Sequence, residues 1–511
     1  MAIQLLLLYL HQYSAPLLFI TFVAYVVHNK YNYGINHIPG PSFAALSDLW
    51  RLIVVWRRRP ELEHIKLHQK YGLVVRLGPK TVSVADPEAI KVIYALNAGF
   101  SDFYPVQQTV AKGHALRSMF NTTDEIFHAK LRRHVSNAYA MSTLVNFEPL
   151  VDSTTTAFLK QLKNRYATPN QICDFGTWLQ WYAFDVIGEL TYSKRLGFVD
   201  RGTDVDNIIS NLEWLLDYVS VIGQIPILDR FFLKNPFRLL LSKWSLINSN
   251  TSVVNFARAR MSDRSTSAAP PDPKRRDFLS RFLSAHEKDP DFIPQDRVLA
   301  LTVANMFAGS DTTAITLRAI FYYLLKNPAC MSRLLSELAT FPAPDEGSPP
   351  LVSWSQARDL PYLSAVIKEA LRMHPAVGLT LERVVPAQGV TVARTFLPGG
   401  TIVGCSAWVL HRDERVFGED AGMFRPERWL DGKRGKEMEG YLFSFGAGAR
   451  TCIGKNISLL EMYKLVPAVL RAFEIELAEP EKEWTLHNAW FVKQSDFNVR
   501  LRVREKPLQV Q

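Results

Sequence analysis

The chain has 511 residues, of which 48% are hydrophobic and 21% are charged. This composition excludes a disordered tail and a small disulfide-held module, and it is sufficient to bury a large core. The formal net charge of +10 suits an acidic protein, an anionic membrane surface or nucleic acid, and charge alone does not choose among them. The four cysteines are widely spaced without a CxxC pair, which argues against a disulfide framework and structural zinc and favours a reducing compartment.

The amino-terminal segment is strongly apolar. No charged residue precedes Lys30, and residues 3–27 are about as long as the roughly 20 residues of a bilayer-spanning helix. The segment has neither the basic leader nor the cleavage pattern of a secretory signal. We predict a membrane anchor over residues 1–30. Because basic residues follow it, the positive-inside tendency places the rest of the chain in the cytosol.

Prolines follow the predicted anchor. Ile38-Pro39-Gly40-Pro41 cannot continue a helix, so we predict a proline-rich hinge over residues 31–44.

Further along the chain the pattern is mainly helical. Apolar residues recur at spacings of three and four, which predicts helices within residues 151–162, 184–191, 205–221, 298–325 and 362–373.

Strand patterns are fewer. Residues 73–85 and 390–408 carry β-branched runs on either side of Gly78-Pro79 and Pro398-Gly399-Gly400, which predicts two strand pairs. The expected fold class is therefore mainly α with a small β region. The apolar connection at residues 228–233 fits two alternatives, a membrane-dipping loop and ordinary core packing.

A glycine-rich loop at residues 443–454 contains Cys452 and is followed by a helical pattern over residues 455–473. A cysteine just before a helix faces free backbone N–H groups and the positive end of the helix dipole, which favours the thiolate. Such a thiolate is a ligand for haem iron, and the loop's glycines allow the backbone to approach a flat cofactor. Arg450 is placed to pair with a porphyrin carboxylate.

This loop resembles the haem-binding signature FxxGxRxCxG of the cytochrome P450 superfamily. The matching residues, expected to bind haem with Cys452 as the axial iron ligand, are Phe445, Gly448, Arg450, Cys452 and Gly454. A second match is ExxR with a later arginine. Glu369 and Arg372 lie one helical turn apart and can pair, and Arg428 supplies a second cation, so the resemblance implies that these three lock the fold.

Residues 308–313 interrupt an apolar helical pattern with small and polar residues, in complete agreement with the family's (A/G)Gx(D/E)T(T/S). Gly309 leaves room, and the Thr312 hydroxyl is expected to take up a backbone carbonyl and open the helix locally over the haem. Asp311 and Thr312 are the predicted catalytic residues, because an acid linked to solvent and a neighbouring hydroxyl can relay protons to reduced oxygen. A merely back-bonding threonine is the structural alternative.

The resemblance implies further haem contacts. His128 and Arg132 resemble the family's WxxxR, with histidine in the tryptophan position, and spacing of four places both on one helix face toward a propionate. Arg383 matches a strand arginine that reaches a propionate in many relatives. Pocket residues are expected from residues 103–120, Asn305, residues 377–381 and Trp490-Phe491.

The resemblance covers nearly the whole chain. Residues 192–198, 222–226 and 454–462 look like filamentous-fungal microsomal members similar to pisatin demethylase and benzoate hydroxylases. This implies a haem-thiolate fold in which residues 45–511 form a single catalytic domain. It also implies haem b as cofactor and localisation in the endoplasmic reticulum membrane as a single-pass protein facing the cytosol.

The implied activity is a monooxygenase that inserts one atom of O2 into an apolar small molecule, as a tailoring step in secondary metabolism. No flavin or nicotinamide fingerprint is present, so electrons are expected from a separate NADPH-cytochrome reductase, with membrane lipid as a further partner and no nucleic acid. Lys130, Arg132, Arg133 and Lys455 suit an acidic docking partner. The alternatives are a haem-thiolate isomerase or dehydratase acting on a peroxide, and a non-catalytic haem sensor.

Overall fold

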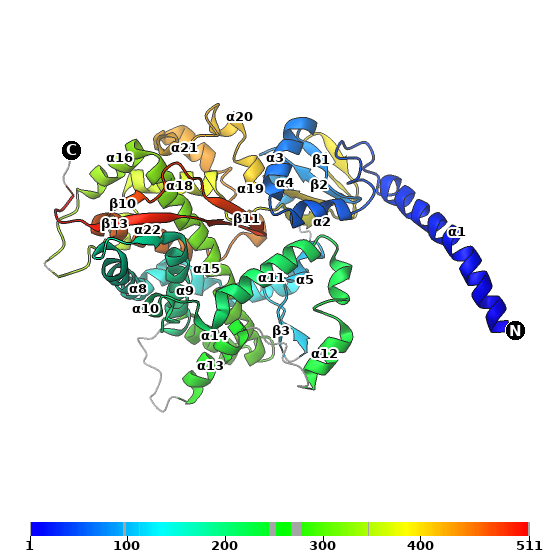
Figure 1. The fold of residues 1–511 in the computed structure, drawn as a ribbon, viewed down its shortest axis with the longest axis horizontal. Helices are drawn as coiled ribbons and strands as arrows, with labels where there is room; N and C mark the ends of the chain where they lie inside the picture. The colour runs from blue at the N-terminus through cyan, green and yellow to red at the C-terminus, as the bar shows by residue number, and fades with distance from the viewer. Residues whose placement is uncertain are drawn as a thin grey trace.

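The structure is a computed structural model that describes residues 2–95, 99–111, 113–244, 252–266, 277–345 and 347–508. These residues form a mainly helical body beside a smaller region of short strands, and helix α1 (Ala2–Tyr31) extends away from both (Figure 1). The expected class, mainly α with a small β region, is confirmed.

Helix α15 (Gln295–Lys326) runs through the centre of the helical body. It packs most closely on α9 (Phe175–Tyr192), which is buried over nearly its whole length because it is apolar on every face. The longer helices around this pair are α8 (Glu148–Leu162), α11 (Ile208–Ile222), α13 (Ser252–Thr266), α14 (Phe278–Lys288), α16 (Pro328–Leu338), α18 (Pro361–Met373) and α22 (Lys455–Ala472).

Among the described residues, α15 is the one helix with the length and apolar composition of a membrane span. However, 72% of its most apolar window is buried in the protein, as in a core helix.

The helices expected at 151–162, 184–191, 298–325 and 362–373 are confirmed as α8, part of α9, α15 and α18. The helix expected from residue 205 begins later, as α11. Asp206 and Asn207 have φ of 51° and 53°, a left-handed conformation that an α-helix cannot include.

The principal sheet has the strand order β1-β2-β9-β6. Its strands are β1 (Val74–Arg76), β2 (Thr81–Val84), β6 (Leu381–Val384) and β9 (Ile402–Cys405), and only the β2–β9 pair is parallel. A second sheet joins β10 (Phe473–Leu477), β13 (Asn498–Val503) and β5 (Ile172–Asp174). Separate hairpins pair β3 (Val110–Ala111) with β4 (His114–Ala115), β7 (Val390–Val392) with β8 (Thr395–Leu397), and β11 (Thr485–Ala489) with β12 (Phe491–Ser495).

The strand pair predicted within 73–85 is confirmed, but the pairing predicted across Pro398-Gly399-Gly400 is wrong. The hairpin turns earlier, at Ala393 and Arg394, whose φ values of 46° and 62° suit a two-residue turn with the twist of the flanking strands. The strand after the glycines, β9, pairs instead with β2 and β6. This long-range pairing has no local signature.

The junction between α1 and the globule is built around Arg76, which is buried on β1. Its guanidinium donates to the carbonyl oxygens of Asn29 at 2.8 Å, Lys30 at 3.1 Å and Pro79 at 2.6 Å. A cation at the last carbonyls of a helix is stabilised by the helix dipole. The following segment also contributes Ile35 and Ile38 to a buried cluster.

Several large apolar side chains between residues 226 and 244 face solvent. Phe231 and Phe232, which follow the short helix η5 (Pro226–Arg230), are 68% and 53% exposed. Phe237, on α12 (Pro236–Lys243), and Trp244 are also exposed. Of the two alternatives for residues 228–233, core packing is therefore wrong for both phenylalanines.

Candidate active site

The loop that carries Cys452 is closed by backbone hydrogen bonds. The N–H of Cys452 donates to the carbonyl of Phe445 at 2.9 Å, and Gly446 and Gly448 have φ of 66° and 70°. A Cβ at Gly448 would lie 1.9 Å from the carbonyl oxygen of Tyr94, and one at Gly446 would lie 3.3 Å from Leu381. These two glycines therefore permit the loop to pack on protein neighbours, in addition to any approach of a cofactor.

The Cys452 sulfur lies just before α22, as the sequence predicted. Cys452 is an exposed residue although protein surrounds it on a larger scale, so it is not covered by packed side chains. Burial raises the pKa of the thiol, while the N–H groups of Gly454 and Lys455 and the charge of Arg132 act to lower it. The expected effect of the helix terminus is therefore present, since these N–H groups favour the thiolate, but burial opposes it. A coordinating metal ion would remove the proton.

Three charged residues are brought together behind this loop. Arg372 donates to both oxygens of Glu369, at 2.9 and 2.7 Å, and Arg428 donates to the same carboxylate at 3.0 Å. All three are buried, and Trp429 also donates to Glu369, at 2.8 Å. For a buried carboxylate with this many donors, charge-assisted hydrogen bonds offset the free energy lost with its hydration.

The charged group is connected to the cysteine loop through α18. The imidazole of His411 accepts from the N–H of Phe443 at 2.8 Å, and its other ring nitrogen therefore donates to the carbonyl of Arg372 at 3.0 Å. The hydroxyl of Ser444 donates to the carbonyl of Leu371 at 2.7 Å. Two hydrogen-bonded links thus position the start of the loop relative to Glu369 and Arg372.

Four basic side chains from distant segments lie near one another, and one of them, Arg132, acts on the Cys452 thiol. They are His128 and Arg132 on α6 (Glu125–Val135), Arg383 on β6, and Arg450. Burial and the charges of the three arginines lower the pKa of His128 to about 4, so its imidazole is neutral near pH 7. Arg132 donates to the carbonyl of Thr451 at 2.9 Å. The guanidinium groups of Arg383 and Arg450 lie 4.5 and 4.2 Å from the centre of the Phe100 ring.

This cluster has an excess of positive charge. Among the described residues, Glu125 is the one carboxylate within 4 Å of these arginines, and it pairs with Arg450 at 2.7 Å. Glu125 and Phe100 were not found from the sequence. For Glu125 the one signal was its place as an acid in the first turn of α6. No local pattern predicts its pairing with Arg450.

On α15, Thr312 donates to the carbonyl of Ala308, four residues earlier, at 2.8 Å, which is the back-bonding geometry of the structural alternative. The expected opening of the helix is absent, and α15 is continuous across residues 308–313. Ala308 is exposed and Thr312 is half-buried within an otherwise buried helix, whereas Asp311 faces inward. A Cβ at Gly309 would lie 3.0 Å from Ile187, so this glycine allows α9 to approach α15.

Helices α15 and α22 are joined where they pack together. The hydroxyls of Thr313 and Ser458 form a hydrogen bond of 2.8 Å, directly after Thr312 in one helix and within two turns of Cys452 in the other. Asn305, expected in the pocket, accepts from Tyr139 at 2.5 Å. The structure thus brings the Asp311-Thr312 segment and the cysteine segment to neighbouring positions.

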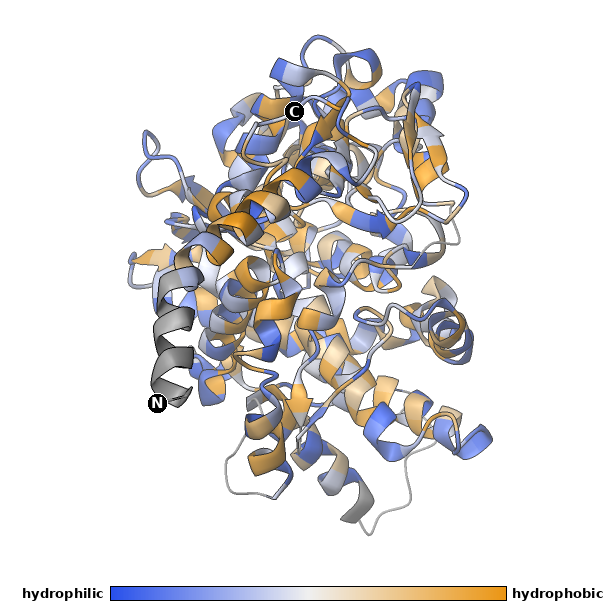
Figure 2. Ribbon diagram, turned by 90° about the vertical axis from the view of Figure 1, so that its right-hand side faces the viewer, coloured by the Kyte–Doolittle hydropathy of each residue, from blue (hydrophilic) through white to orange (hydrophobic). Residues whose placement is uncertain are grey.

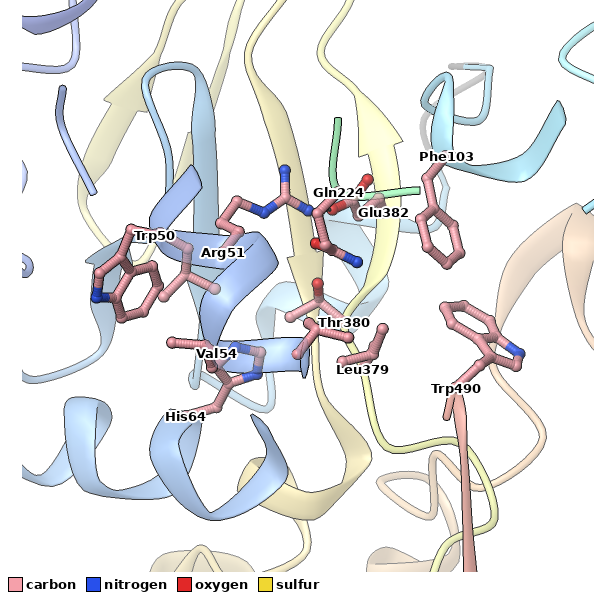
Figure 3. A pocket seen from close by; sticks show the side chains of 12 residues that line it. Trp50, Arg51, Val54, His64, Phe103, Gln224, Leu379, Thr380, Glu382 and Trp490 are labelled. Atoms are coloured by element: carbon pink, nitrogen blue, oxygen red, sulfur yellow. Dashed lines mark hydrogen bonds and ion pairs between the residues drawn. The ribbon is translucent and has the colours of Figure 1, made fainter. Parts of the chain in front are cut away.

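The other expected pocket segments meet in a small apolar cluster. It contains Phe100, Phe103, Tyr104, Leu379 and Trp490, and Gly378 donates to the carbonyl of Trp490 at 2.8 Å. Figure 3 shows Phe103 and Trp490 side by side, across a cavity of about 20 Å³ from α2 (Leu49–Trp56). This cavity has room for about one water molecule, and Cys452 does not line it.

The residues fit a haem group. The open side of the Cys452 sulfur offers a ligand for iron, and the excess positive charge of Arg132, Arg383 and Arg450 suits the two carboxylates of the porphyrin. The aromatic ring of Phe100 lies against two of these arginines. A helical protein with this arrangement is of the haem-thiolate class.

Comparison with known proteins agrees with this class. The Cytochrome P450 family model matches residues 41–498. A cytochrome P450 monooxygenase of Emericella nidulans, cicH, is 42% identical over 494 residues, which cover 96% of this chain and 98% of the relative. A cytochrome P450 monooxygenase of Aspergillus terreus is 44% identical over 448 residues, covering 86% and 90%. A third, AFLA_114810 of Aspergillus flavus, is 39% identical over 479 residues, covering 92% and 93%.

The chain belongs to the cytochrome P450 family. It is therefore an oxidoreductase that incorporates oxygen, in a family that uses haem iron, a redox partner and small-molecule substrates.

Proposed function

We propose that the protein is a membrane-anchored haem-thiolate monooxygenase that inserts one atom of O2 into an apolar organic molecule. The observation that carries the proposal is the Thr313–Ser458 hydrogen bond of 2.8 Å, which holds the acid–alcohol segment of α15 beside the segment that begins with Cys452. Electrons would come from an NADPH-dependent reductase, since the sequence has no flavin or nicotinamide motif.

Each part of the site has a role in this proposal. Cys452 would ligate the iron of haem b, and Arg132, Arg383, Arg450 and the neutral His128 would hold its carboxylates. Phe445, Gly448 and Gly454 shape the loop, since the Phe445 carbonyl accepts from Cys452 and the N–H of Gly454 interacts with the sulfur. When bound, haem supplies the redox chemistry with dioxygen, which a thiolate ligand favours by donating electron density.

Asp311 and Thr312 move protons in this scheme. Burial raises the pKa of Asp311, so that its carboxyl group takes up a proton more readily than an exposed aspartate does. The neighbouring hydroxyl of Thr312 passes a proton toward the reacting oxygen and is reprotonated from Asp311. The aromatic cluster around Phe103 and Trp490 favours an apolar substrate.

Membrane anchoring is supported by α1. Its described side chains include many exposed apolar residues, among them Leu17, Leu18, Phe19 and Ile20 at 63–69% exposure, and this stretch is coloured hydrophobic in Figure 2. A helix that projects from the globule with apolar side chains exposed suits lipid. The exposed Phe231, Phe232 and Phe237 suit a second contact with the bilayer, and Arg133 and Lys455 are exposed for an acidic reductase.

The biological role that we propose is a tailoring oxidation in fungal secondary metabolism, in the endoplasmic reticulum membrane with the catalytic domain in the cytosol. It rests on the resemblance to fungal microsomal members and on the fungal origin of the relatives. Deletion of the coding sequence, with metabolite profiling, should cause an apolar precursor to accumulate. Microsomes that contain the enzyme should oxidise that precursor only with NADPH, whereas NADPH-independent conversion would favour the isomerase or dehydratase alternative.

The ligand assignment is tested by spectroscopy. The reduced carbonyl complex of the holoprotein should show the thiolate-type optical band, and Cys452→Ala should abolish it, whereas Cys330→Ala on α16 should not. Thr312→Ala should retain haem but release reducing equivalents as peroxide. An imidazole-type spectrum in the wild type, or full coupling in the Thr312 variant, would contradict the proposal.

A further inference from the structure

A buried glutamine on α9 contacts the predicted catalytic acid. Gln180 is 2% exposed, and its side-chain N–H donates to Asp311 Oδ1 with an N to O distance of 2.6 Å. Its amide oxygen accepts from Nη2 of Arg318 at 3.1 Å. Arg318 is itself 2% exposed and donates through Nε to the carbonyl of Gly176 at 2.9 Å. One glutamine therefore links an acid and an arginine that both belong to α15.

The chemistry of the two partners determines the orientation of this amide. A guanidinium group can only donate, so the amide oxygen has to face Arg318 and the amide N–H groups face Asp311. Asp311 and Arg318 lie about two helical turns apart on the same face of α15, which is the face that packs on α9. A reversed amide would leave a buried donor facing a guanidinium, which is unfavourable.

Gln180 also connects two buried charged groups of opposite sign, Asp311 and Arg318. Among the described residues, no carboxylate lies within 4 Å of the Arg318 guanidinium, although the charges of Asp311, Asp174 and Glu213 act on it. The amide thus transmits polarisation between a buried cation and a buried carboxylate, as hydrogen-bonded chains in a low dielectric do. Removal of the glutamine side chain would break the hydrogen-bonded link between Asp311 and Arg318.

A partly exposed ion pair also acts on Asp311. Lys493 on β12 pairs with Glu213 on α11, and their side chains are 29% and 43% exposed. Lys493 and Arg318 favour the carboxylate form of Asp311, and Glu213 disfavours it. The acid therefore has a buried hydrogen-bond partner, Gln180, and interacts electrostatically with a partly exposed ion pair.

We infer that Gln180 is a positioning residue for oxygenation, which orients the Asp311 carboxylate and couples it to Arg318 so that Asp311 can receive protons from solvent and pass them to Thr312. This inference rests on the proposed function. In each transfer, Asp311 gives its proton to the Thr312 oxygen as the hydroxyl proton leaves toward reduced oxygen, and the resulting carboxylate regains a proton from hydronium in the solvent. The electrons come from the NADPH-dependent reductase.

Two substitutions separate positioning from folding. Gln180→Glu has nearly the same shape and keeps an acceptor for Arg318, but it replaces the donor to Asp311 with an oxygen, so that two carboxyl groups face each other. Gln180→Leu removes both hydrogen bonds. If the leucine variant fails to fold, the glutamate variant still tests the donor. The matched control is Gln494, 1% exposed on β12, whose amide donates to the carbonyl of Ile315 on the same helix at 3.0 Å.

The first measurement is independent of turnover. In the substrate-free holoenzyme, the infrared carbonyl band of protonated Asp311, identified by its loss in Asp311→Asn, is followed against pH. Loss of a donor to the charged form raises the pKa of a carboxyl group. Both Gln180 variants should therefore retain the band to higher pH than wild type, and the equivalent Gln494 variants should not.

The second measurement uses holoenzyme, reductase and NADPH without organic substrate. The measured quantity is the ratio of water to peroxide formed as NADPH is consumed. This ratio should fall about tenfold in the Gln180 variants, as expected for a lost hydrogen bond to an ionised group, and should be unchanged in the Gln494 variants. If both Gln180 variants showed the wild-type infrared titration and the wild-type ratio of water to peroxide, this inference would be overturned, and the proposed function would stand. A wild-type holoprotein without the thiolate-type band would overturn the proposed function, and this inference with it.

Discussion

Arg132 on α6 donates to the carbonyl oxygen of Thr451 at 2.9 Å, which ties α6 to the residue directly before Cys452. The same guanidinium charge acts on the Cys452 thiol and lowers its pKa against the effect of burial. We expect Arg132→Gln to reduce haem per polypeptide by about tenfold, since a charge-assisted hydrogen bond and a cation for the haem carboxylates are lost together. The measurement is haem content after purification. Arg133→Gln, at the next and exposed position, should keep the wild-type content.

The carboxylate of Glu369 holds two buried arginines. In Glu369→Gln, Arg372 and Arg428 lose their shared anion, and breaking a buried ion pair from one side costs about 3–5 kcal/mol. We expect a lower urea midpoint and poor recovery of folded holoprotein. Glu437→Gln, on an exposed face of α21 (Gly432–Glu439), is the control. Equal stability of the two variants would show that Glu369 does not lock the fold.

Gly448 permits a contact that no larger residue allows. With φ of 70° and a Cβ position only 1.9 Å from the Tyr94 carbonyl oxygen, Gly448→Ala requires the loop to move. We expect a loss of more than about 3 kcal/mol of unfolding free energy together with loss of haem. Gly432→Ala, where the added Cβ meets nothing within 4 Å, should change neither. Calorimetry and the haem spectrum give both values.

Acid should destabilise the folded protein through buried histidines. Burial lowers the pKa of His64, His374 and His411 to about 3. The unfolded chain binds these protons near pH 6.5, so unfolding becomes easier as pH falls from about 6.5 toward 3, by about 1.4 kcal/mol per pH unit for each histidine.

One variant isolates this effect. His374→Gln keeps a donor toward the Val492 carbonyl, which His374 contacts at 2.9 Å. Its unfolding free energy, measured in urea between pH 7 and 5, should depend less on pH than that of wild type, and the difference in slope should approach about one proton near pH 5. His114→Gln, at an exposed position, is the control, and equal slopes for all three proteins would contradict the prediction.

Arg76 should determine how firmly α1 is attached. Arg76→Met removes the donors to Asn29 and Lys30 and leaves the end of the helix without its cation. We expect cleavage by a protease within residues 31–44 to become at least several-fold faster, because local opening exposes that backbone. Arg57→Met, at an exposed position nearby, should be cleaved at the wild-type rate.

The amino-acid sequence by itself determined the family, the mainly helical class and the candidate ligand. These depend on local patterns: the spacing within 445–454, the one-turn separation of Glu369 and Arg372, and the periodicity of α15. A helix repeat or a loop motif lies within a short stretch of the chain, so it can be recognised from the sequence without a structure.

Tertiary structure alone decided which distant groups meet. The pairing of β9 with β2 and β6, the Arg450–Glu125 ion pair and the Gln180–Asp311 hydrogen bond join segments that are far apart in the chain. Gln180 gave one hint, as a polar residue within an apolar helix, but its partner is selected by how α9 packs on α15. Tertiary structure also added a burial effect that opposes the helix terminus at the Cys452 thiol, because desolvation depends on everything around the sulfur and not only on the helix that follows it.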